Sequence, residues 1–270
     1  MLKQKPFFDF YITGFTPDSL VDYIFASIDA NEPTILLGLN ADGLNLSRRN
    51  EAYRCLLRSG RFYVYPDGMS VIWALRFFGE SGQQRIPTTD LIIYLMRRIS
   101  IEKKDVTIGF LGGTHEIATL ARRRLNTEFD SNCIVHSYEP GKIDMSDLED
   151  PLSSRVRAIL QELVSHPADI LFVGLGSPKQ EILCQVLQKH VPHKVLLPCG
   201  GLFSYYAGEH KRAPLWMQQT GLEWLFRLLL EPKRLWKRYL LGNAEFVVRV
   251  LDYKFRLMLG KAIARDSSHS

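Results

Sequence analysis

The feature that most constrains this chain is an apolar run followed by a glycine-rich turn and then by a helix. Within residues 169–181, the apolar run 170–173 predicts a buried strand, and Gly174 and Gly176 form the turn before the helix. Such turns let backbone N–H groups approach an anion, and the helix dipole favours negative charge. A plain connection between strand and helix gives the same pattern. Three polar residues in the first helical turn favour a ligand site: Lys179, Gln180 and Glu181.

The same order recurs along the chain and predicts the fold class. Five further apolar runs predict strands, at residues 34–39, 61–65, 106–111, 133–137 and 194–197. Strands that alternate with helices indicate an α/β fold, here Rossmann-like, with a mostly parallel sheet covered by helices on both faces. Ligands of such sheets bind at the carboxyl ends of the strands. Four glycine-containing turns are expected at those ends, at residues 40–43, 66–68, 111–114 and 174–178.

Local signals predict details outside the main sheet. Residues 7–12 alternate weakly between apolar and polar, which indicates an edge strand. Thr16 and Pro17 are typical of an N-cap and of the first helical position, so a helix should begin there. Another helix is expected to begin near residue 88, with Thr88 or Thr89 as its N-cap.

Composition bounds the size of the fold and the charge of its partners. The 270 residues, 46% hydrophobic and 23% charged, suit one large domain or a domain with an appendage. No strand pattern follows Gly201, so we expect an α/β catalytic domain at 1–206, an all-helical appendage at 207–265 and a disordered tail at 266–270. The appendage carries 12 Lys and Arg against 5 Asp and Glu. Its partner should therefore be anionic: nucleotide phosphates, a nucleic acid or a membrane surface.

The sequence gives no sign of a metal site, a redox site or a membrane span. The four cysteines, Cys55, Cys133, Cys184 and Cys199, form no Cys-x-x-Cys pair, and the seven histidines have no ligand spacing. We therefore expect reduced thiols in a cytoplasmic protein, with no metal and no cofactor. The first residues lack the apolar core of a signal peptide, and no apolar run reaches the roughly 18 residues of a membrane span.

Asp67 is the candidate catalytic residue. It follows a predicted strand and precedes a helix, so it should lie at the ligand end of the sheet. The alternative is an N-cap of the helix that follows, because Asp caps helices well.

A second set of candidates is cationic. Arg234, Lys237 and Arg238 are spaced to share one face of a helix. Together with Arg212 and Arg227 they could clamp a diphosphate, which a guanidinium group matches in bidentate geometry. The alternative is a solvated helix face with no ligand.

The last predicted helix, residues 244–264, is amphipathic in an unusual way. On a helical wheel its charged residues form one narrow stripe, and apolar residues spread over most of the rest. Lys254 lies inside the apolar face, where a lysine can reach lipid head groups while its neighbours bury. Packing on the main domain is the alternative. Four residues are the candidates for membrane contact: Phe246, Val250, Lys254 and Leu257.

With these residues in view, the chain resembles the WecG/TagA/CpsF glycosyltransferase family, from about Asp9 to Val250. So many matching motifs in the right order are unlikely by chance. The motifs are Tyr65-Pro-Asp-Gly-Met-Ser-Val-Ile-Trp, Gly109-Phe-Leu-Gly-Gly, Val173-Gly-Leu-Gly-Ser-Pro-Lys-Gln-Glu, Gly208 through Arg212-Ala-Pro, Gly221-Leu-Glu-Trp-Leu-Phe-Arg-Leu, Glu231-Pro and Arg238-Tyr.

The resemblance implies an inverting, metal-independent transfer of a sugar from a UDP-sugar to an undecaprenyl-diphosphate-linked sugar in surface polysaccharide or exopolysaccharide synthesis. It implies that Asp67 is the base that takes a proton from the acceptor hydroxyl. It also implies that the cations Arg227, Arg234 and Lys237 or Arg238 meet the charge on UDP. The other residues expected to bind the donor are Asn40, Gly112, Gly113, Gly174, Gly176, Lys179, Gln180, Glu181 and Arg212.

The resemblance extends to the appendage, which is similar to the segment that targets the family to membranes. We therefore expect a peripheral protein on the inner face of the plasma membrane. The appendage is also expected to complete the active site, closing over it on membrane binding. The sequence leaves the oligomeric state open, so a homo-oligomer stays possible.

The sequence departs from the family at two places. Family members often carry Thr in a Thr-x-Asn motif after the second strand, and here the aligned residues are Gly38-Leu39-Asn40. Residues 135–140, Val-His-Ser-Tyr-Glu-Pro, differ from the usual His-Gly-Tyr form. The donor sugar therefore stays open among N-acetylmannosamine, its uronic acid and glucose.

Two other classes of function are alternatives. A nucleic-acid-binding module without enzymatic activity would use the basic appendage, but Trp216, Trp224 and Trp236 are spaced as helix-packing residues rather than as a stacking surface. We therefore expect no nucleic acid partner. A dinucleotide-dependent oxidoreductase would use the Gly-x-Gly turn, but the third glycine and the acid about 20 residues further on are missing.

Overall fold

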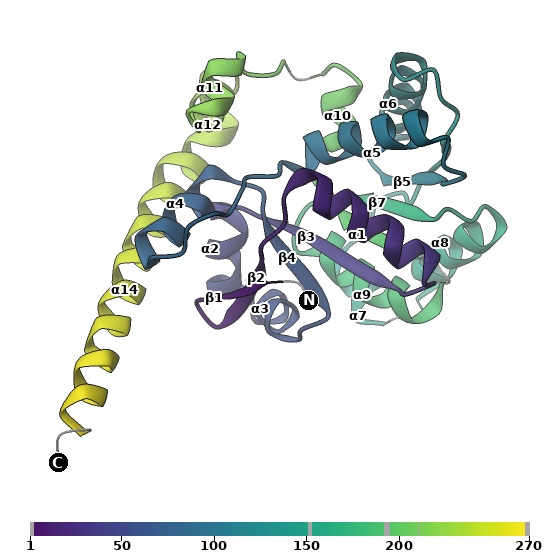
Figure 1. Cartoon of the computed structure of the whole chain (residues 1–270). Coiled ribbons are helices and arrows are strands. Elements are labelled where there is room, and N and C mark those ends of the chain that lie inside the picture. The colour runs from purple at the N-terminus through teal and green to yellow at the C-terminus, as the bar shows by residue number, and fades with distance from the viewer. Residues whose placement is uncertain (1–2, 151–152, 192–194, 210, 268–270) are drawn as a thin grey trace.

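A six-stranded parallel sheet forms the centre of the molecule (Figure 1). The computed structural model describes residues 3–150, 153–191, 195–209 and 211–267. The strands lie in the order β4-β3-β8-β7-β5-β6, and all their pairings are parallel. The sheet confirms the predicted α/β class. Its strands are β3 (Thr34–Leu39), β4 (Phe62–Pro66), β5 (Ile108–Gly112), β6 (Ile134–Tyr138), β7 (Ile170–Gly174) and β8 (Val195–Pro198).

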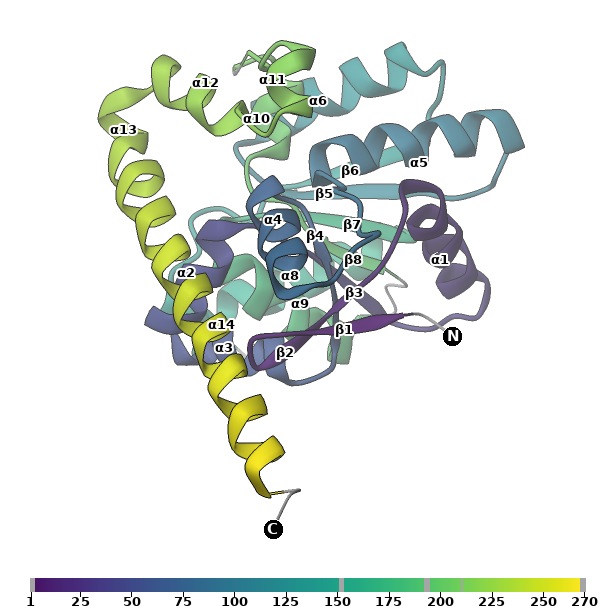
Figure 2. The ribbon, with the colours of Figure 1, turned by 60° about the vertical axis from the view of Figure 1, so that its left-hand side comes forward.

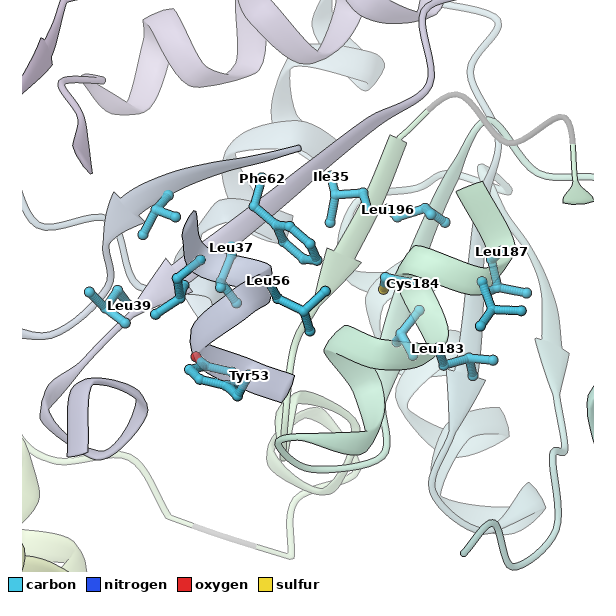
Figure 3. Packing of buried hydrophobic residues seen from close by; sticks show 14 of the residues in the cluster. Ile35, Leu37, Leu39, Tyr53, Leu56, Phe62, Leu183, Cys184, Leu187 and Leu196 are labelled. Atoms are coloured by element: carbon cyan, nitrogen blue, oxygen red, sulfur yellow. The ribbon is translucent and has the colours of Figure 1, made fainter. Parts of the chain in front are cut away.

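Helices cover both faces of the sheet, because successive side chains of each buried strand point to opposite faces. Ile35 and Leu37 pack into one cluster of buried residues, and Leu36 between them packs into the other. Figure 3 shows the first cluster, in which Ile35 and Leu196 of the sheet lie near side chains of the covering helices. This face carries α2 (Ala41–Arg49), α3 (Glu51–Arg58), α4 (Met69–Phe78), α7 (Met145–Glu149), α8 (Ser154–Ser165) and α9 (Lys179–His190). The other face carries α1 (Pro17–Asp29), α5 (Thr88–Glu102), α6 (His115–Glu128) and α10 (Leu202–Tyr206).

The N-terminal segment forms a hairpin rather than the single edge strand predicted for residues 7–12. Strands β1 (Gln4–Phe7) and β2 (Phe10–Thr13) pair with each other in antiparallel orientation, apart from the main sheet. The turn between them places Phe8 at a φ of 55°. The predicted start of the next helix is confirmed, because Thr16 caps α1 in a capping box with Ser19.

The predicted cap of α5 is wrong. Pro87 occupies the N-cap position and neither threonine side chain caps the helix, because Thr88 is already the first helical residue. The backbone N–H of Thr88 donates instead to Oδ1 of Asp67, at 2.6 Å. A long-range contact therefore replaces the local cap that the sequence predicts.

After the sheet, the described residues from 199 onward form helices and connecting segments without a strand. The helices that follow α10 are α11 (Leu215–Gln219), α12 (Glu223–Leu230), α13 (Pro232–Trp236), the π-helical turn η1 (Lys237–Leu241) and α14 (Gly242–Ser267). In Figures 1 and 2, α14 runs past α2 and extends beyond the rest of the molecule. It includes residues 266 and 267 of the tail that we expected to be disordered, and residues 268–270 lie outside the described residues.

Polar contacts fasten α14 to α2 and to the hairpin. Glu245 forms an ion pair with Arg49, and the Arg249 guanidinium donates to the carbonyl of Leu44. At the hairpin, the hydroxyl of Tyr253 donates to the carbonyl of Phe8, at 3.0 Å. The charged stripe of α14 therefore faces the α/β domain over part of its length.

Candidate active site

A cleft of about 2020 Å³ lies where the carboxyl ends of the strands meet the appendage. Residues that follow β3, β4, β5, β7 and β8 line one side, and residues of α12, α13, η1 and α14 line the other. Pockets for one small molecule usually measure roughly 300–1,000 Å³. The cleft is thus large enough for two substrates side by side.

Asp67 lies in this cleft, at the end of β4, and is half-buried. Its backbone N–H donates to the carbonyl of Leu39, at 2.9 Å. Oδ1 of its carboxylate accepts two hydrogen bonds from Thr88, from the backbone N–H at 2.6 Å and from the hydroxyl at 3.0 Å. The next helix, α4, has Gly68 as its N-cap and no side-chain cap. Asp67 is therefore not the cap of α4, and its carboxylate is fixed by α5 instead.

Arg85 joins Asp67 to the appendage, and sequence reasoning missed it. Its Nε donates to the backbone carbonyl of Asp67 at 3.0 Å, and its two terminal nitrogens donate to the Gln218 carbonyl at 3.1 Å and to the Glu223 carboxylate at 2.6 Å. Burial alone would raise the pKa of Glu223, but the hydrogen bond and charge of Arg85 outweigh it and lower that pKa. The signal available in the sequence was the position of Arg85, in the segment between two predicted helices and outside both of them.

Gln180 connects two of the turns at the sheet edge. Its Oε1 accepts from the backbone N–H groups of Gly176, at 3.2 Å, and of Gly200, at 3.0 Å. Its Nε2 donates to Glu181 at 2.8 Å. Gln180 is only 5% exposed, so it positions the backbone of both turns rather than projecting freely into the cleft.

Glu181 is a buried carboxyl group at the base of the cleft, 1% exposed. Its Oε1 accepts from the hydroxyl of Ser177 at 2.7 Å, and Oε2 has no hydrogen-bond partner among the described residues. Burial raises the pKa of Glu181, although the hydrogen bonds from Gln180 and Ser177 oppose the shift. Burial without a cation therefore favours the neutral acid.

The glycines at the ends of β5 and β7 allow a close approach of two turns. Gly112 has a φ of 121°, and a Cβ there would lie 2.5 Å from the carbonyl oxygen of Gly174. Any side chain at residue 112 would therefore force the strand ends apart. Gly113, Gly174 and Gly176 line the cleft, whereas Gly112 does not.

Two predicted donor-binding residues point to other partners. The ammonium group of Lys179 donates to the carbonyl of Ile143 at 2.7 Å, and Arg212 forms a part-buried ion pair with Asp90. Neither lines the cleft. Asn40 does line it, and its side chain caps α2 by accepting from the N–H of Gly43 at 3.1 Å.

Four of the predicted cations are brought together. One helical face was expected for three of them, but Lys237 and Arg238 lie in the π-helical turn, whose i→i+5 spacing differs from that of α13. The three arginines have weak local partners, such as Glu231 at 2.5 and 2.8 Å from Arg234, or Asp42 at 3.0 Å from Arg238. These are exposed pairs, which a stronger anion can replace. The predicted cations that line the cleft are Arg227, Arg234, Lys237 and Arg238.

An apolar wall continues the cleft between α4 and α14. Trp73 and Phe77 of α4 line it from one side, 47% and 46% exposed, and Val247 and Leu251 of α14 line it from the other. The ammonium group of Lys254 lies 5.5 Å from the centre of the Phe77 ring. The described cleft therefore has a carboxylate, a group of cations and an apolar wall in one continuous space.

The membrane-contact prediction is wrong for two of its four residues. Phe246 and Val250 are 6% and 7% exposed and pack into the core beside α2, so the α/β domain covers them. Leu257 is exposed, and Lys254 is partly buried against Phe77. Four other apolar residues of α14 are exposed and do not line the cleft: Val248, Phe255, Met258 and Leu259.

Neither a metal centre nor a membrane span is found in the part of the chain that the structure describes. No group of three or more His, Cys, Asp or Glu side chains there is arranged to hold an ion. None of the helices formed by those residues is both long enough and apolar enough to cross a bilayer.

A comparison with known protein families agrees with the geometry of the site. The model of the family described as "Glycosyl transferase WecG/TagA/CpsF family" matches residues 6–259, nearly the whole chain. The match includes the sheet, Asp67, Arg85 and the four predicted cations that line the cleft. The chain therefore belongs to the WecG/TagA/CpsF family and is a glycosyltransferase.

Proposed function

We propose that the protein transfers a sugar from a UDP-sugar to a polyprenyl-diphosphate-linked sugar, with inversion and without a metal, in the synthesis of a surface polysaccharide. The observation that carries the proposal is the composition of the cleft. One continuous space contains the carboxylate of Asp67, four cations from α12, α13 and η1, and an apolar wall. A sugar hydroxyl, a diphosphate and a lipid chain require groups of these three kinds.

The donor diphosphate is proposed to bind the cations of the cleft. Arg227, Arg234, Lys237 and Arg238 line one space, and the three arginines pair with the carboxylates of Glu223, Glu231 and Asp42. A diphosphate carries more charge than one carboxylate and accepts bidentate hydrogen bonds from guanidinium groups. The same cations would stabilise the charge that develops on UDP as it leaves.

Asp67 is proposed to act as the general base. It takes the proton from the acceptor hydroxyl while that oxygen forms a bond to the anomeric carbon of the donor. The bond between this carbon and the phosphate oxygen breaks at the same time, and UDP leaves with the electron pair. Attack from the face opposite UDP inverts the anomeric centre. Both hydrogen bonds that Thr88 donates to the carboxylate go to Oδ1. Oδ2 of Asp67 is therefore the oxygen that we propose takes the proton.

The lipid part of the acceptor is proposed to enter along the apolar wall between α4 and α14. Trp73, Phe77 and Leu251 continue the cleft away from the cations, as a diphosphate-linked lipid requires. The exposed apolar residues of α14 would contact the bilayer itself. On this view the protein is peripheral on the cytoplasmic face of the membrane.

An assay of UDP release with a panel of donors tests the proposal. The purified protein is given a short-chain polyprenyl-diphosphate-linked sugar and UDP-N-acetylmannosamine, its uronic acid form or UDP-glucose. We expect release with one donor only, dependent on the acceptor and stimulated by anionic vesicles. Asp67→Asn should abolish release while it leaves UDP binding intact. Silence with every donor, in the presence of vesicles and several acceptor sugars, would contradict the proposal.

A further inference from the structure

Gly38 lies on β3 directly beside the carboxylate of Asp67. A Cβ at this position would lie 2.7 Å from the hydroxyl oxygen of Thr88, 3.0 Å from Cβ of Asp67 and 3.2 Å from its Oδ1. Contacts under 3.0 Å are essentially absent between real atoms of this kind. The space beside the carboxylate that a side chain from β3 would fill is thus already filled, by the hydroxyl of Thr88 from α5.

The Thr88 hydroxyl is held between two other polar groups. It donates to Oδ1 of Asp67 at 3.0 Å, and it lies 2.9 Å from the hydroxyl of Tyr65. Burial, and secondly the charge of Asp67, raise the pKa of Tyr65, so this phenol stays protonated. Tyr65 therefore donates to Thr88, and Thr88 turns its only hydroxyl proton toward Asp67. Tyr65 is fully buried and Thr88 is 7% exposed, whereas Asp67 is half-buried and lines the cleft.

We propose that Thr88 is a positioning residue for Asp67, and that residues 38 and 88 can exchange this role. The space beside the carboxylate has room for a side chain from one of the two residues but not from both. In this chain the hydroxyl beside the carboxylate comes from residue 88, and glycine at residue 38 leaves the room for it. The positioning role rests on the proposed function of Asp67 as the base, whereas the exchange between residues 38 and 88 does not.

The positioning role is tested by removing the hydroxyl while keeping the volume. Thr88→Val should lower kcat about 10- to 100-fold, as expected when a reacting group is misplaced by about an ångström. The KM for the donor should change little, because Thr88 does not touch the cations. Thr88→Ser restores the hydroxyl and should restore kcat.

Thr13→Val is the matched control for these variants. Thr13 is a fully buried threonine of β2, and its hydroxyl oxygen has no partner among the described residues. Its replacement removes a buried hydroxyl away from the cleft and should leave kcat unchanged. A wild-type kcat in Thr88→Val, or a loss in Thr88→Ser as large as in Thr88→Val, overturns the positioning role.

The exchange itself is tested by moving the side chain from residue 88 to residue 38. Gly38→Thr alone should lower both stability and kcat, because its Cβ collides with Thr88. Thr88→Gly alone should lower kcat, because the hydroxyl is lost. In the double variant Gly38→Thr/Thr88→Gly the closest contact, with Thr88, is gone, and the tight contacts with Asp67 remain. A hydroxyl again lies within reach of Oδ1, so both properties should recover in part relative to Gly38→Thr. Such non-additivity is the signature of two residues in contact.

The two properties separate failure of this inference from failure of the proposed function. Urea unfolding of the four chains in the cycle measures coupling between residues 38 and 88 with no substrate. Additive effects on stability overturn the exchange, whether or not the protein releases UDP. If coupling is found but Asp67→Asn turns over normally, then the proposed base is wrong and the contact is structural only. That result overturns the positioning role and leaves the exchange standing.

Discussion

The two sides of the cleft are held in different ways. On the sheet side, Asp67 and Gln180 are each fixed by at least two hydrogen bonds, and backbone N–H groups from other segments are among the donors. On the appendage side, the cations are exposed and pair with neighbouring carboxylates, as Arg234 does with Glu231. Exposed pairs of this kind contribute only about 0–1 kcal/mol. The sheet side is therefore prebuilt, whereas the appendage side can rearrange around an anion.

Arg85 is the place where the two sides meet. It contacts the backbone of Asp67 on the sheet side and the Glu223 carboxylate on the appendage side, both in part-buried positions. Arg85 therefore links the position of the appendage directly to the backbone of Asp67, the residue proposed as the base. The predictions below test whether the prebuilt side controls the chemical step and the adaptable side controls binding.

The largest effect is expected on the sheet side. Asp67→Asn should lower kcat about 10²- to 10⁴-fold, the usual range for loss of a general base. UDP binding, measured by calorimetry, should be unchanged. Asp105→Asn, at an exposed carboxylate outside the cleft, is the control. Normal turnover by Asp67→Asn would mean that Asp67 is not the general base.

The next effect is expected on the appendage side. Arg227→Ala/Arg234→Ala should lower kcat/KM about 10²-fold, because the charge of the leaving UDP is no longer met. Part of the loss should appear as a higher KM for the donor. Lys233→Ala removes a nearby exposed cation of α13 that does not line the cleft. Equal losses in the two variants would mean that net charge, not the clamp, is responsible.

The link between the sides should show as a coupling energy. Arg85→Leu leaves the Glu223 carboxylate without its main partner and should lower the free energy of unfolding by about 1–3 kcal/mol. Adding Glu223→Leu should recover part of this loss. Urea unfolding of the two single variants and the double variant measures the coupling. Simple additivity would mean that the pair does not connect the sheet to the appendage.

The pH dependence of stability should carry a contribution from Glu181. Its pKa is raised in the folded protein, so between the unfolded value near 4.5 and the folded value the native state binds more protons. Its contribution is thus fully present at low pH and is lost as pH rises, by at most about 1.4 kcal/mol per pH unit. The free energy of unfolding, measured by urea denaturation at a series of pH values from 4 upward, should depend less on pH for Glu181→Gln than for the exposed control Glu116→Gln. An equal pH dependence of the unfolding free energy in the two variants would contradict the raised pKa of Glu181.

The smallest effect is expected on the outer surface of α14. Val248→Ser/Phe255→Ser should weaken binding to anionic vesicles about tenfold, because two exposed apolar side chains no longer insert. Thermal stability should not change. Val135→Ser, at an exposed valine on β6, is the control in a vesicle sedimentation assay. Unchanged vesicle binding would mean that the exposed apolar residues of α14 do not contact the membrane.

The sequence patterns predicted the alternation of strands, glycine turns and helices along the chain, because a buried strand, its turn and its helix are neighbours in sequence. Contacts between distant segments could not be predicted in this way. Thr88 meets Asp67 across 21 residues, and Arg85 meets Glu223 across 138. Local propensity made Thr88 a plausible helix cap, and the tertiary contact with Asp67 decided its real partner. Likewise, a helical wheel located the apolar residues of α14 but could not tell that α2 covers Phe246 and Val250.

The contact between α14 and the hairpin gives the molecule a particular order of assembly. Tyr253 stacks on Phe8, with ring centres 4.5 Å apart, and bonds to its carbonyl across 245 residues of chain. Part of the platform for the appendage is thus synthesised 245 residues before its partner on α14. Until residue 253 has been synthesised, the contact that fastens α14 to the hairpin cannot form. This fastening of the cleft wall therefore comes late in the assembly of the site.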